Sequence, residues 1–589
     1  MSKKIVLLRP SMMVPRWAHV SSICPPLGLA YVAAAIRKAG YDPRCVDGIG
    51  EAPFQRIALE NPNFLIYGLS AQEIGERAGT CDIAGISLMF SHDWSLGKSI
   101  IQEVRKKNPS AIIIGGGEHI NAVPEFCLQD CPELDICVLG EGEETTVELL
   151  KVFDNGNDLS HVKGIVYRAN GAPVRNALRA RISKLEDIPW PAWDLFPLEN
   201  YLANKLGYGV NPGRTVPILA SRGCPFECTF CSSPQMWTRH WQARATDDVI
   251  AEMKYYIENY GAQNFDFYDL TAVIRKDWVL EFCQKIIDRK WKITWQMPAG
   301  TRSEALDAES LRMMRLSGQK NLGYAPESGS PATLKRIKKK VAIERMTESI
   351  KAALKEKMNV KLNVIMGFPH ETSREIFKTF AFLLRMAFLG VHDVYIACFS
   401  PYPGSELFKE LERDGRIKAM DADYFLMLTS YSDLKHSYSY SPHLSNRLLR
   451  LYRLGGMALF YSLSYLLRPA RLLRVVTNLI KGKEESRLDV ALHNLKDRIL
   501  SKKIRFKEGG IGGAARLELL SNLKIFHFNS SPLIRKFAWV ILLALALKFL
   551  YLWIAPSRAM LINDARSRNV SATSVANGDG IVEYGQRAR

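Results

Sequence analysis

Short apolar runs alternate with amphipathic helical patterns over residues 1–150. This alternation predicts an α/β fold with an open parallel sheet, because each helix returns the chain to the same edge of the sheet. Three predicted strands end in glycine-containing loops at Gly85–Ser87, Gly115–His119 and Gly140–Glu143, and ligands of such sheets bind outside the carboxyl ends of the strands. The predicted strands are Lys4–Leu8, Arg44–Asp47, Ile83–Met89, Ala111–Ile114 and Ile136–Leu139, and the predicted helices are Pro26–Ala39 and Ser95–Lys107.

A second alternation of strands and helices covers residues 216–410. Its six strand–helix units predict a full or partial parallel barrel, whose chemistry sits at the carboxyl ends of the strands. Residues 151–215 are predicted to be a connector, because Leu185–Asp194 is rich in Pro and Trp. The predicted strands are Val216–Ala220, Asn264–Tyr268, Ile293–Gln296, Leu322–Ala325, Lys361–Met366 and Val394–Phe399, with helices that include Asp247–Tyr260 and Asp307–Ser317.

The last part of the chain shows no strand pattern and predicts helices. Residues 411–534 form a basic amphipathic region, in which Leu448–Leu479 interleaves Arg with apolar residues as in an interfacial segment. The alternative for that segment is a core helix pair whose Arg side chains reach solvent. In residues 535–589, Phe537–Ala555 comprises 19 residues that are apolar except for Lys548 and predicts a membrane helix, followed by a short polar tail. The alternative for this helix is a buried position in a C-terminal bundle.

Positive charge is concentrated in the same part of the chain. The chain has 79 Lys and Arg against 60 Asp and Glu, a net charge of +19. Residues 441–589 hold 25 of the basic and 9 of the acidic residues, so the rest is near neutral. A nucleic-acid surface usually adds aromatic residues or a recognisable binding fold, so the pattern favours a membrane over RNA. Arg535 and Lys536, just before the predicted membrane helix, favour a cytoplasmic position for the main body of the protein. Lys502–Lys507 is expected to be a solvated face.

Three cysteines stand out by their spacing. The strand Val216–Ala220 runs into Cys224, Cys228 and Cys231, a C-x₃-C-x₂-C pattern on one short loop. Structural zinc takes four ligands, and His240 is the nearest further candidate. Three thiolates instead suit a [4Fe–4S] cluster with one iron left open for a cofactor. The eleven cysteines are an odd number and follow no signal peptide, which favours a reducing compartment over a disulfide framework.

This cysteine loop resembles that of the radical S-adenosylmethionine (SAM) enzymes. The resemblance implies that the three cysteines hold the cluster, that its open iron binds SAM, and that Phe230 packs by the adenine. Further segments agree in order: Tyr324–Ser330 resembles the E-S-G segment that contacts the ribose, Ile365–Thr372 a G-[FL]-P-x-E-T turn, and Phe399–Leu407 a P-x-P-G-[ST]-x-L segment. The implied SAM-binding residues are Phe230, Gln296, Arg302, Glu327, Ser328, Gly329 and Gly367.

Some positions in the barrel are less well assigned. Gln296 and Arg302, at the third strand end, contact SAM or substrate in one interpretation and pack at the barrel rim in the other. Asp266 and Asp269 stand where the family often has a D-D-x-F segment, but the sequence departs from that segment and leaves their role open.

The N-terminal region resembles the cobalamin-binding Rossmann-like domains that are fused to such barrels. Cys24–Tyr31 resembles their P-P-L-G-L-x-Y opening, and the three glycine-containing loops match in position. No His here has Asp two residues before it, so the D-x-H-x-x-G motif is absent and the resemblance implies base-off cobalamin without a protein His ligand. The alternative is a degenerate domain that has lost cobalamin. The implied cobalamin-binding residues are Leu27, Gly28, Ser87, Gly115, Gly116, Gly117, Glu118, His119, Glu141, Gly142 and Glu143.

The two resemblances together imply a cobalamin-dependent radical SAM enzyme of the C-methyltransferase or oxidative cyclase type. Related classes are the anaerobic magnesium-protoporphyrin monomethyl ester cyclase-like and the hopanoid- or lipid-modifying enzymes. With the apolar and basic C-terminal part, a lipid or isoprenoid substrate at the membrane is expected, with flavodoxin or ferredoxin as electron donor and no nucleic acid. Porphyrin cyclisation is the alternative, followed by nucleic-acid modification and a cobalamin sensor. The tRNA methylthiotransferases need a second N-terminal set of three cluster cysteines, which is not seen here.

Overall fold

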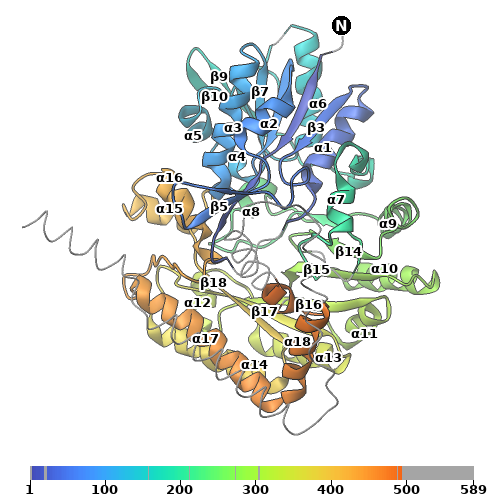
Figure 1. Cartoon of the computed structure of the whole chain (residues 1–589), viewed down its shortest axis with the longest axis vertical. Coiled ribbons are helices and arrows are strands. Elements are labelled where there is room, and N and C mark those ends of the chain that lie inside the picture. The colour runs from blue at the N-terminus through green and yellow to red at the C-terminus, as the bar shows by residue number, and fades with distance from the viewer. Residues whose placement is uncertain are drawn as a thin grey trace, which may run out of the picture. The chain divides into compact units, whose positions relative to one another are not determined.

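The computed structural model describes residues 3–18, 23–156, 158–210, 213–271, 274–302, 306–486 and 488–493. All of these belong to one compact unit, Met1–Lys503 (Figure 1). In this part of the chain, no helix has the length and apolar character needed to cross a membrane. The segments Lys502–Lys507 and Phe537–Ala555, for which a solvated face and a membrane helix are predicted, lie outside the described residues.

The N-terminal half contains a seven-stranded sheet in the order β10-β9-β8-β7-β6-β1-β3. The five strands from β8 to β3 are parallel, as the sequence predicts, and β9 and β10 add an antiparallel hairpin at one edge. The strands are β1 (Ile5–Arg9), β3 (Pro43–Asp47), β6 (Ile83–Ser87), β7 (Ile112–Gly116), β8 (Ile136–Val138), β9 (Ile165–Ala169) and β10 (Ala172–Arg175). The helices are α1 (Leu27–Lys38), α2 (Ala71–Ala78), α3 (Trp94–Lys107), α4 (Glu118–Ala122), α5 (Pro124–Asp130) and α6 (Gly142–Asp154).

Two features of this half differ from the sequence prediction. The β9–β10 hairpin lies in residues 151–215, so part of the predicted connector belongs to the first sheet. A small antiparallel sheet of β2 (Met12–Pro15), β5 (Phe64–Tyr67) and β4 (Arg56–Ala58) was also not predicted. These strands pair antiparallel, so they do not belong to the strand–helix alternation from which the parallel sheet was predicted. The rest of the connector holds η2 (Leu185–Asp187), η3 (Trp193–Leu195) and α7 (Leu198–Ala203).

The second half is a partial parallel barrel. Its six strands pair in sequence order, β11-β14-β15-β16-β17-β18, and within the described residues β11 and β18 do not pair with each other. All six predicted strands are confirmed. They are β11 (Thr215–Ile218), β14 (Asn264–Phe267), β15 (Thr294–Thr301), β16 (Gln319–Glu327), β17 (Asn359–Met366) and β18 (Asp393–Cys398). The helices are α8 (Ser233–Trp237), α9 (Thr246–Tyr260), α10 (Lys276–Asp288), α11 (Ala308–Leu316), α12 (Pro331–Arg336), α13 (Ile343–Lys355), α14 (Ser373–Leu389), α15 (Glu406–Arg413) and α16 (Ala422–Leu428).

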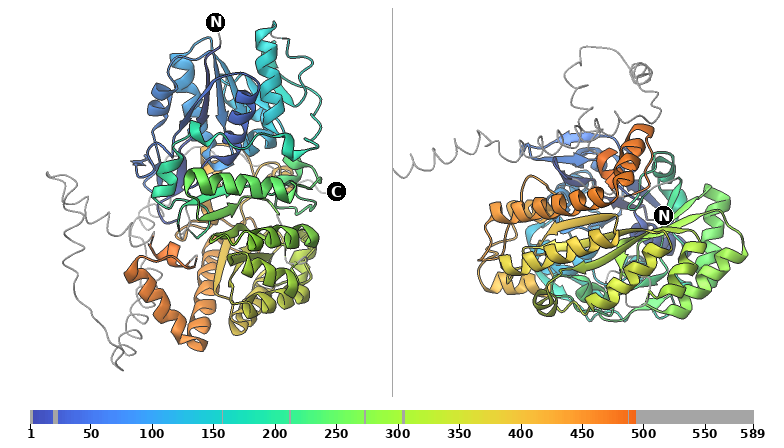
Figure 2. Two further views of the ribbon diagram at one scale, coloured as in Figure 1. Left: turned by 90° about the vertical axis from the view of Figure 1, so that its right-hand side faces the viewer. Right: turned by 90° about the horizontal axis from the view of Figure 1, so that it is seen from below.

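The predicted interfacial segment Leu448–Leu479 is two helices, α17 (Asn446–Leu467) and α18 (Pro469–Lys481), which Pro469 separates. α17 packs against α14 and β18, as the views in Figures 1 and 2 show. The buried Arg453 donates hydrogen bonds to four backbone carbonyls, those of Ile396, Ser430, Tyr431 and Asp433.

Two further arginines of this segment also bind protein rather than headgroups. Arg468 donates to the carbonyls of Ala387 and Phe388, and Arg471 donates to those of Gly390 and Val391, at the end of α14. The predicted interfacial segment would place its arginines at anionic lipid headgroups, and for these arginines that prediction is wrong. The last carbonyls of a helix lack intrahelical partners and accept hydrogen bonds from cations instead. The alternative of a packed helix pair describes this side of α17.

Candidate active site

The three predicted cluster cysteines lie on the loop between β12 (Ser221–Arg222) and β13 (Gln242–Ala243). Gly223 begins this loop with a φ of +88°, and a Cβ there would come 2.0 Å from the His240 carbonyl oxygen, so only glycine fits. Thr229, between Cys228 and Cys231, donates its N–H to the Ile337 carbonyl at 3.1 Å. Its own carbonyl accepts from the Leu407 N–H at 2.9 Å. The loop is therefore fixed by the ends of two other barrel elements.

The donor set of this loop fits an iron–sulfur cluster. All three thiols are partly exposed. Burial raises the pKa of Cys228 and raises that of Cys231 to about 11. A bound metal cation would oppose this effect, because it stabilises the thiolate form. Within the described ranges, no three His, Cys, Asp or Glu side chains form a site for a single metal ion. The preference for a cluster over zinc rests on the ligand set, because structural zinc takes a fourth ligand, whereas three thiolates without imidazole or carboxylate partners suit a cluster with one open iron.

Aromatic residues from three motif segments meet beside the loop. The ring centroid of Phe230 lies 5.7 Å from that of Phe368, and Phe368 lies 5.3 Å from Phe399. The tertiary structure thus brings together the cysteine loop, the Ile365–Thr372 turn and the Phe399–Leu407 segment. Contact between Phe230 and the adenine of SAM stays a prediction.

The segment after β16 is held by hydrogen bonds and close packing. Glu327 has a φ of +63°, which non-glycine residues rarely adopt, and its buried carboxylate accepts from Lys339 at 2.9 Å. The hydroxyl of Ser328 pairs with that of Thr379 at 3.0 Å, and the Gly329 N–H donates to the same Thr379 oxygen at 3.1 Å. Ser328 and Gly329 therefore join the strand end to α14, and contact of Glu327, Ser328 or Gly329 with SAM stays a prediction.

The turn at Gly367 has its own internal partner. Its N–H donates to Glu371 Oε2 at 2.7 Å, and its φ is +88°. Burial raises the pKa of Glu371 to about 7, against the opposing effect of the hydrogen bonds from the backbone N–H groups of Gly367 and Phe368. Glu371 was not singled out as a site residue from the sequence, although it is the acidic residue of the G-[FL]-P-x-E-T pattern.

Gln296 and Arg302, both predicted to contact SAM or substrate, lie apart from each other. Gln296 Nε2 donates to the Val210 carbonyl and to Asp266 Oδ1, both at 2.7 Å, so in this structure it holds the chain before β11. The Arg302 guanidinium lies 3.5 Å from the ring centroid of Phe226 in the cysteine loop. Arg302 is therefore beside the cluster loop, and Gln296 is engaged inside the barrel.

Asp269, whose role the sequence left open, supports the cysteine loop. Its Oδ1 accepts from the Ser221 hydroxyl at 2.5 Å, and its Oδ2 accepts from the Ala220 N–H at 3.1 Å. Burial raises its pKa to about 6, although these hydrogen bonds favour the charged form. Asp269 thus fixes the strand from which the loop departs.

The predicted cobalamin residues lie where the parallel strands of the first sheet end. A Cβ added at Gly28, Gly116 or Gly140 would meet nothing within 4 Å, so these glycines border open space that a bulky ligand can fill. Gly115 and Gly142 are more closely packed, and Leu27 is buried in the core. Ser87 ends β6 and is half-buried. At Gly117 a Cβ would come 2.6 Å from the Leu88 carbonyl oxygen, which explains the glycine at that turn.

His119 is directed into the protein. It is 1% exposed, its Nδ1 pairs with the Ser91 hydroxyl at 3.0 Å, and its ring packs against Trp94 and Phe425. Burial lowers its pKa to about 3, so the imidazole is neutral. Its role as a cobalamin contact stays a prediction, and its surroundings are those of a core residue.

The carboxylates of the cobalamin edge bind the cysteine loop directly. Arg222, two residues before Cys224, donates to Glu141 Oε1 at 3.1 Å and to Glu143 Oε1 at 2.5 Å, and all three side chains are buried. On the other side of the cysteines, Ser232 donates to Glu118. These contacts, which we call the interdomain brace, place the carboxyl edge of the first sheet against both ends of the cluster loop.

Arg181 completes the interdomain brace by donating to Glu141 Oε2 at 2.8 Å. Burial raises the pKa of Glu141, but the hydrogen bond from Arg181 and the charges of Arg222 and Arg181 outweigh it and hold that pKa below its ordinary value. In the sequence, Glu141 and Glu143 follow a predicted strand and Arg222 precedes the cysteines. No local pattern indicates that these residues form ion pairs.

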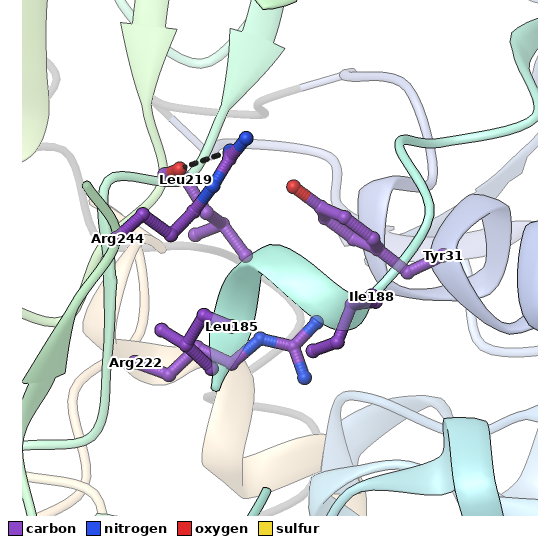
Figure 3. Close-up of a pocket in the computed structure, with 6 residues that line it drawn as sticks. All are labelled: Tyr31, Leu185, Ile188, Leu219, Arg222 and Arg244. Carbon is purple, nitrogen blue, oxygen red and sulfur yellow. Dashed lines mark hydrogen bonds between the residues drawn. The ribbon is translucent and has the colours of Figure 1, made fainter. Parts of the chain in front are cut away.

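A small cavity lies behind the cluster loop (Figure 3). It is lined by Tyr31, Leu185, Ile188, Leu219, Arg222 and Arg244. Its volume of about 10 Å³ is near the lower limit for one water molecule. In the described part of the chain the buried Tyr31 hydroxyl finds no hydrogen-bond partner, and a water there would satisfy it. The connector thus seals the junction between α1 and the cluster strand.

Comparisons with known proteins agree with these two sites. Residues 218–383 match the family model of the radical SAM superfamily, and residues 14–150 match that of the B12 binding domain. An uncharacterized methyltransferase of Pyrococcus horikoshii is 27% identical over 74% of this chain and 88% of its own length. Cytidylyl-2-hydroxyethylphosphonate methyltransferase of Streptomyces wedmorensis is 28% identical over 72% of this chain and 84% of its own.

Two further relatives match with lower identity. The anaerobic magnesium-protoporphyrin IX monomethyl ester cyclase of Cereibacter sphaeroides is 25% identical over 67% of this chain and 61% of its own length. The hopanoid C-3 methylase of Methylococcus capsulatus is 22% identical over 65% of this chain and 67% of its own.

The fold is also that of a solved structure. The radical SAM methyltransferase TsrM of Kitasatospora setae, with cobalamin and a [4Fe–4S] cluster bound, has a TM-score of 0.59 and 15% identity over 79% of this chain and 89% of its own. The cofactors of this chain are accordingly a [4Fe–4S] cluster, SAM and cobalamin. The protein is therefore an enzyme that belongs to the cobalamin-binding radical SAM family.

Proposed function

We propose that this enzyme methylates an unactivated carbon of a hydrophobic, lipid- or isoprenoid-like substrate at the cytoplasmic face of the membrane. The observation that carries the methyl-transfer part is the interdomain brace, because it holds the two cofactor sites next to each other. When bound, the cluster and SAM would supply the radical chemistry that removes a hydrogen atom from the substrate carbon, and cobalamin would supply the methyl group that replaces it.

The residues of the chain hold and separate these reactants. Cys224, Cys228 and Cys231 hold the cluster, and the Phe230–Phe368 contact gives one side of the site an apolar wall that keeps water from the radical. The carboxylates of Glu141 and Glu143 fix Arg222, so the cluster loop cannot drift from the edge that binds cobalamin. Reactive radicals require such fixed geometry, since a displacement of about 1 Å lowers rates by orders of magnitude.

Half-buried aromatic residues of the barrel and of the segments beside it support a hydrophobic substrate with rings. Tyr208 packs edge-on against Tyr268 with centroids 6.0 Å apart, and the Tyr395 hydroxyl donates to the Tyr431 carbonyl at 3.3 Å. Tyr431 in turn lies 6.3 Å from His92, which belongs to the loop after β6. Aromatic faces with polar ends bind flat apolar molecules well. The relative that modifies a hopanoid adds support to this substrate class.

A reductant is required to reduce the cluster, and we propose a flavodoxin or ferredoxin. The partly exposed cysteine loop is compatible with electron transfer from a docked protein. No nucleic acid is part of the proposal.

A second candidate is oxidative cyclisation of a porphyrin ester. The cyclase of Cereibacter sphaeroides supports it, and its substrate would also use an aromatic site. The two candidates differ in product, since only the first adds a carbon to the substrate.

The test is isotope tracing in cells with and without the protein. Cells receive methionine with a deuterated methyl group under anaerobic conditions, and their lipid and porphyrin extracts are compared by mass spectrometry. We expect a labelled lipid that depends on the wild-type chain and is lost with Cys228→Ala. Cys283→Ala, which removes a cysteine of the α10 core, is the matched control and keeps the product. A new porphyrin that carries no more label than its precursor supports the second candidate. A labelled RNA base that appears only with the wild-type chain, in RNA digested from the same cells, contradicts both.

A further inference from the structure

Large apolar side chains are exposed on three adjacent helices, α14, α17 and α18. Of the 17 large hydrophobic side chains that are exposed in the described part of the chain, these helices carry eight, although they are a small share of it. A contiguous group of exposed apolar side chains marks an interaction surface, whereas single exposed leucines occur on most protein surfaces and need no explanation. We call these residues the apolar face: Phe377, Phe388, Leu451, Leu459, Leu466, Leu467, Leu473 and Ile480.

Helical spacing places the apolar face on the side of α17 away from the core. Leu451, Leu459 and Leu466 are spaced by eight and seven residues and so share one side, whereas Leu449, Arg453 and Phe460 are buried on the other. An outward side of a soluble helix normally carries charged residues. Here Gly455, Ala458 and Ser462 lie between the leucines.

α14 extends this face beside α17. The Tyr452 hydroxyl donates to the Ser373 hydroxyl at 2.9 Å near the start of both helices, and Arg468 reaches the Ala387 carbonyl at 3.0 Å near the end of both. The helices therefore run in parallel, as can be followed in Figure 1. Phe377 lies 5.7 Å from the ring centroid of Tyr452, so the exposed phenylalanines of α14 continue the leucine stripe of α17.

The exposed charges on these three helices all have one sign. None of the exposed side chains on the three helices is acidic. Exposed basic side chains flank the apolar residues on each helix: Arg374, Lys378 and Arg385 on α14, Arg447 on α17, and Arg474 and Lys481 on α18. These differ from Arg453, Arg468 and Arg471, which bind carbonyls of the protein itself. A surface of leucine and phenylalanine with basic borders is complementary to an anionic lipid headgroup layer over acyl chains.

We propose that the apolar face of α14, α17 and α18 is the surface by which this protein lies on an anionic bilayer. This deepens the proposed membrane location and rests on it. Charge argues against two other occupants. Residues 494–589 contain sixteen Lys and Arg against six Asp and Glu, so this segment would be repelled by the basic border. A second copy of the chain, docked by the same face, would meet like charges in the same way.

The test measures binding of the full chain to vesicles. Vesicles of phosphatidylcholine with phosphatidylglycerol are compared with vesicles of phosphatidylcholine alone, by flotation and without SAM, cobalamin or substrate. We expect the wild type to bind the anionic vesicles more tightly and to lose binding as salt rises. The double variant Leu459→Gln with Leu466→Gln should bind the anionic vesicles roughly tenfold more weakly, because two apolar side chains no longer enter the acyl region.

Matched variants on α11 control for the loss of any exposed residue. Leu316 is 61% exposed and Leu466 is 65% exposed, so Leu316→Gln removes an equivalent leucine from another surface and should bind as wild type. Likewise, Lys378→Gln with Arg385→Gln should weaken binding to anionic vesicles only, by several-fold per charge, and Arg312→Gln should not.

Three results would overturn the proposal. The leucine double variant binds anionic vesicles as tightly as wild type, which would assign binding to another segment such as residues 537–555. Alternatively, neither protein binds vesicles and the double variant lowers the oligomer mass in light scattering, which would make the face a contact between copies. If Leu316→Gln lost as much vesicle binding as the double variant, the loss would come from removing any exposed leucine and not from the apolar face. Since α14, α17 and α18 residues of the face hold no cofactor, SAM cleavage by the reconstituted variants should equal wild type. Failure of vesicle binding is thereby distinguished from failure of the proposed reaction.

Discussion

Replacing Arg222 by Met tests whether the interdomain brace holds the two cofactor sites together. The change removes a guanidinium that is 8% exposed and that makes hydrogen bonds of 3.1 Å to Glu141 and 2.5 Å to Glu143. Glu141 keeps Arg181, but Glu143 loses the partner that neutralises it. Removal of one member of a buried ion pair costs about 3–5 kcal/mol. We therefore expect the free energy of unfolding to fall by that amount.

The assay is urea denaturation of the full chain followed by intrinsic fluorescence, for wild type, Arg222→Met, Glu143→Gln and the double variant. The double variant should recover part of the loss, with a coupling energy of about 0.5–3 kcal/mol, because the uncompensated carboxylate is gone. Arg275→Met is the control, since Arg275 makes an exposed pair with Asp277. If Arg222→Met behaved like this control, or if the coupling were zero, the brace would not carry the interdomain contact.

The pH dependence follows from Glu141. Its pKa in the folded protein lies below the ordinary value of about 4.5, so the stabilisation it gives is present above that value and is lost as the pH falls through the lowered pKa. The difference in stability between wild type and Arg222→Met should therefore be constant near neutral pH and shrink in acid below about 4.5. A difference that stayed constant into acid would contradict this reasoning.

Four further predictions concern single sites. Cys224→Ala should lose most of the bound iron and the cleavage of SAM after anaerobic reconstitution, as measured by iron content and 5′-deoxyadenosine formation; unchanged values would refute the cluster assignment. Gly329→Ala should lower stability by about 1–3 kcal/mol in urea titration, because its Cβ would lie 2.5 Å from Phe382 Cβ; a neutral effect would show that α14 can move. Arg453→Met should cost about 3–5 kcal/mol, because four carbonyls lose a buried donor, and thermal unfolding checks it. Glu371→Gln should gain stability relative to wild type as the pH rises from about 4.5 to about 7, because the raised pKa of Glu371 makes its ionisation oppose folding; parallel pH profiles would contradict this.

Local patterns were sufficient for the order of elements. The alternation of apolar strands and amphipathic helices predicted both parallel sheets, since the hydrophobic pattern of one strand or helix is complete within about ten residues. The C-x₃-C-x₂-C spacing predicted the cluster loop for the same reason, and the matches to the radical SAM superfamily and the B12 binding domain confirm the two domains. The β9–β10 hairpin was not predicted, because two antiparallel strands joined without a helix do not continue the strand–helix alternation.

Contacts between distant residues were decided by the tertiary structure. Arg222 and Glu143 are 79 residues apart, and no pattern in either segment indicates that they pair. The arginines of α17 and α18 show the same limit, because their spacing predicts an interfacial helix. Arg453 is instead buried, where the carbonyls of Ile396 in β18 and of Tyr431 accept its hydrogen bonds.

The sequence by itself therefore determined which chemistry this protein carries, because cysteine spacing and strand order are properties of short stretches. The fold alone decided where the two cofactor sites lie relative to each other, and which basic residues turn inward and which border the apolar face. The physical reason is that burial and ion pairing depend on partners that are close only after the chain has folded.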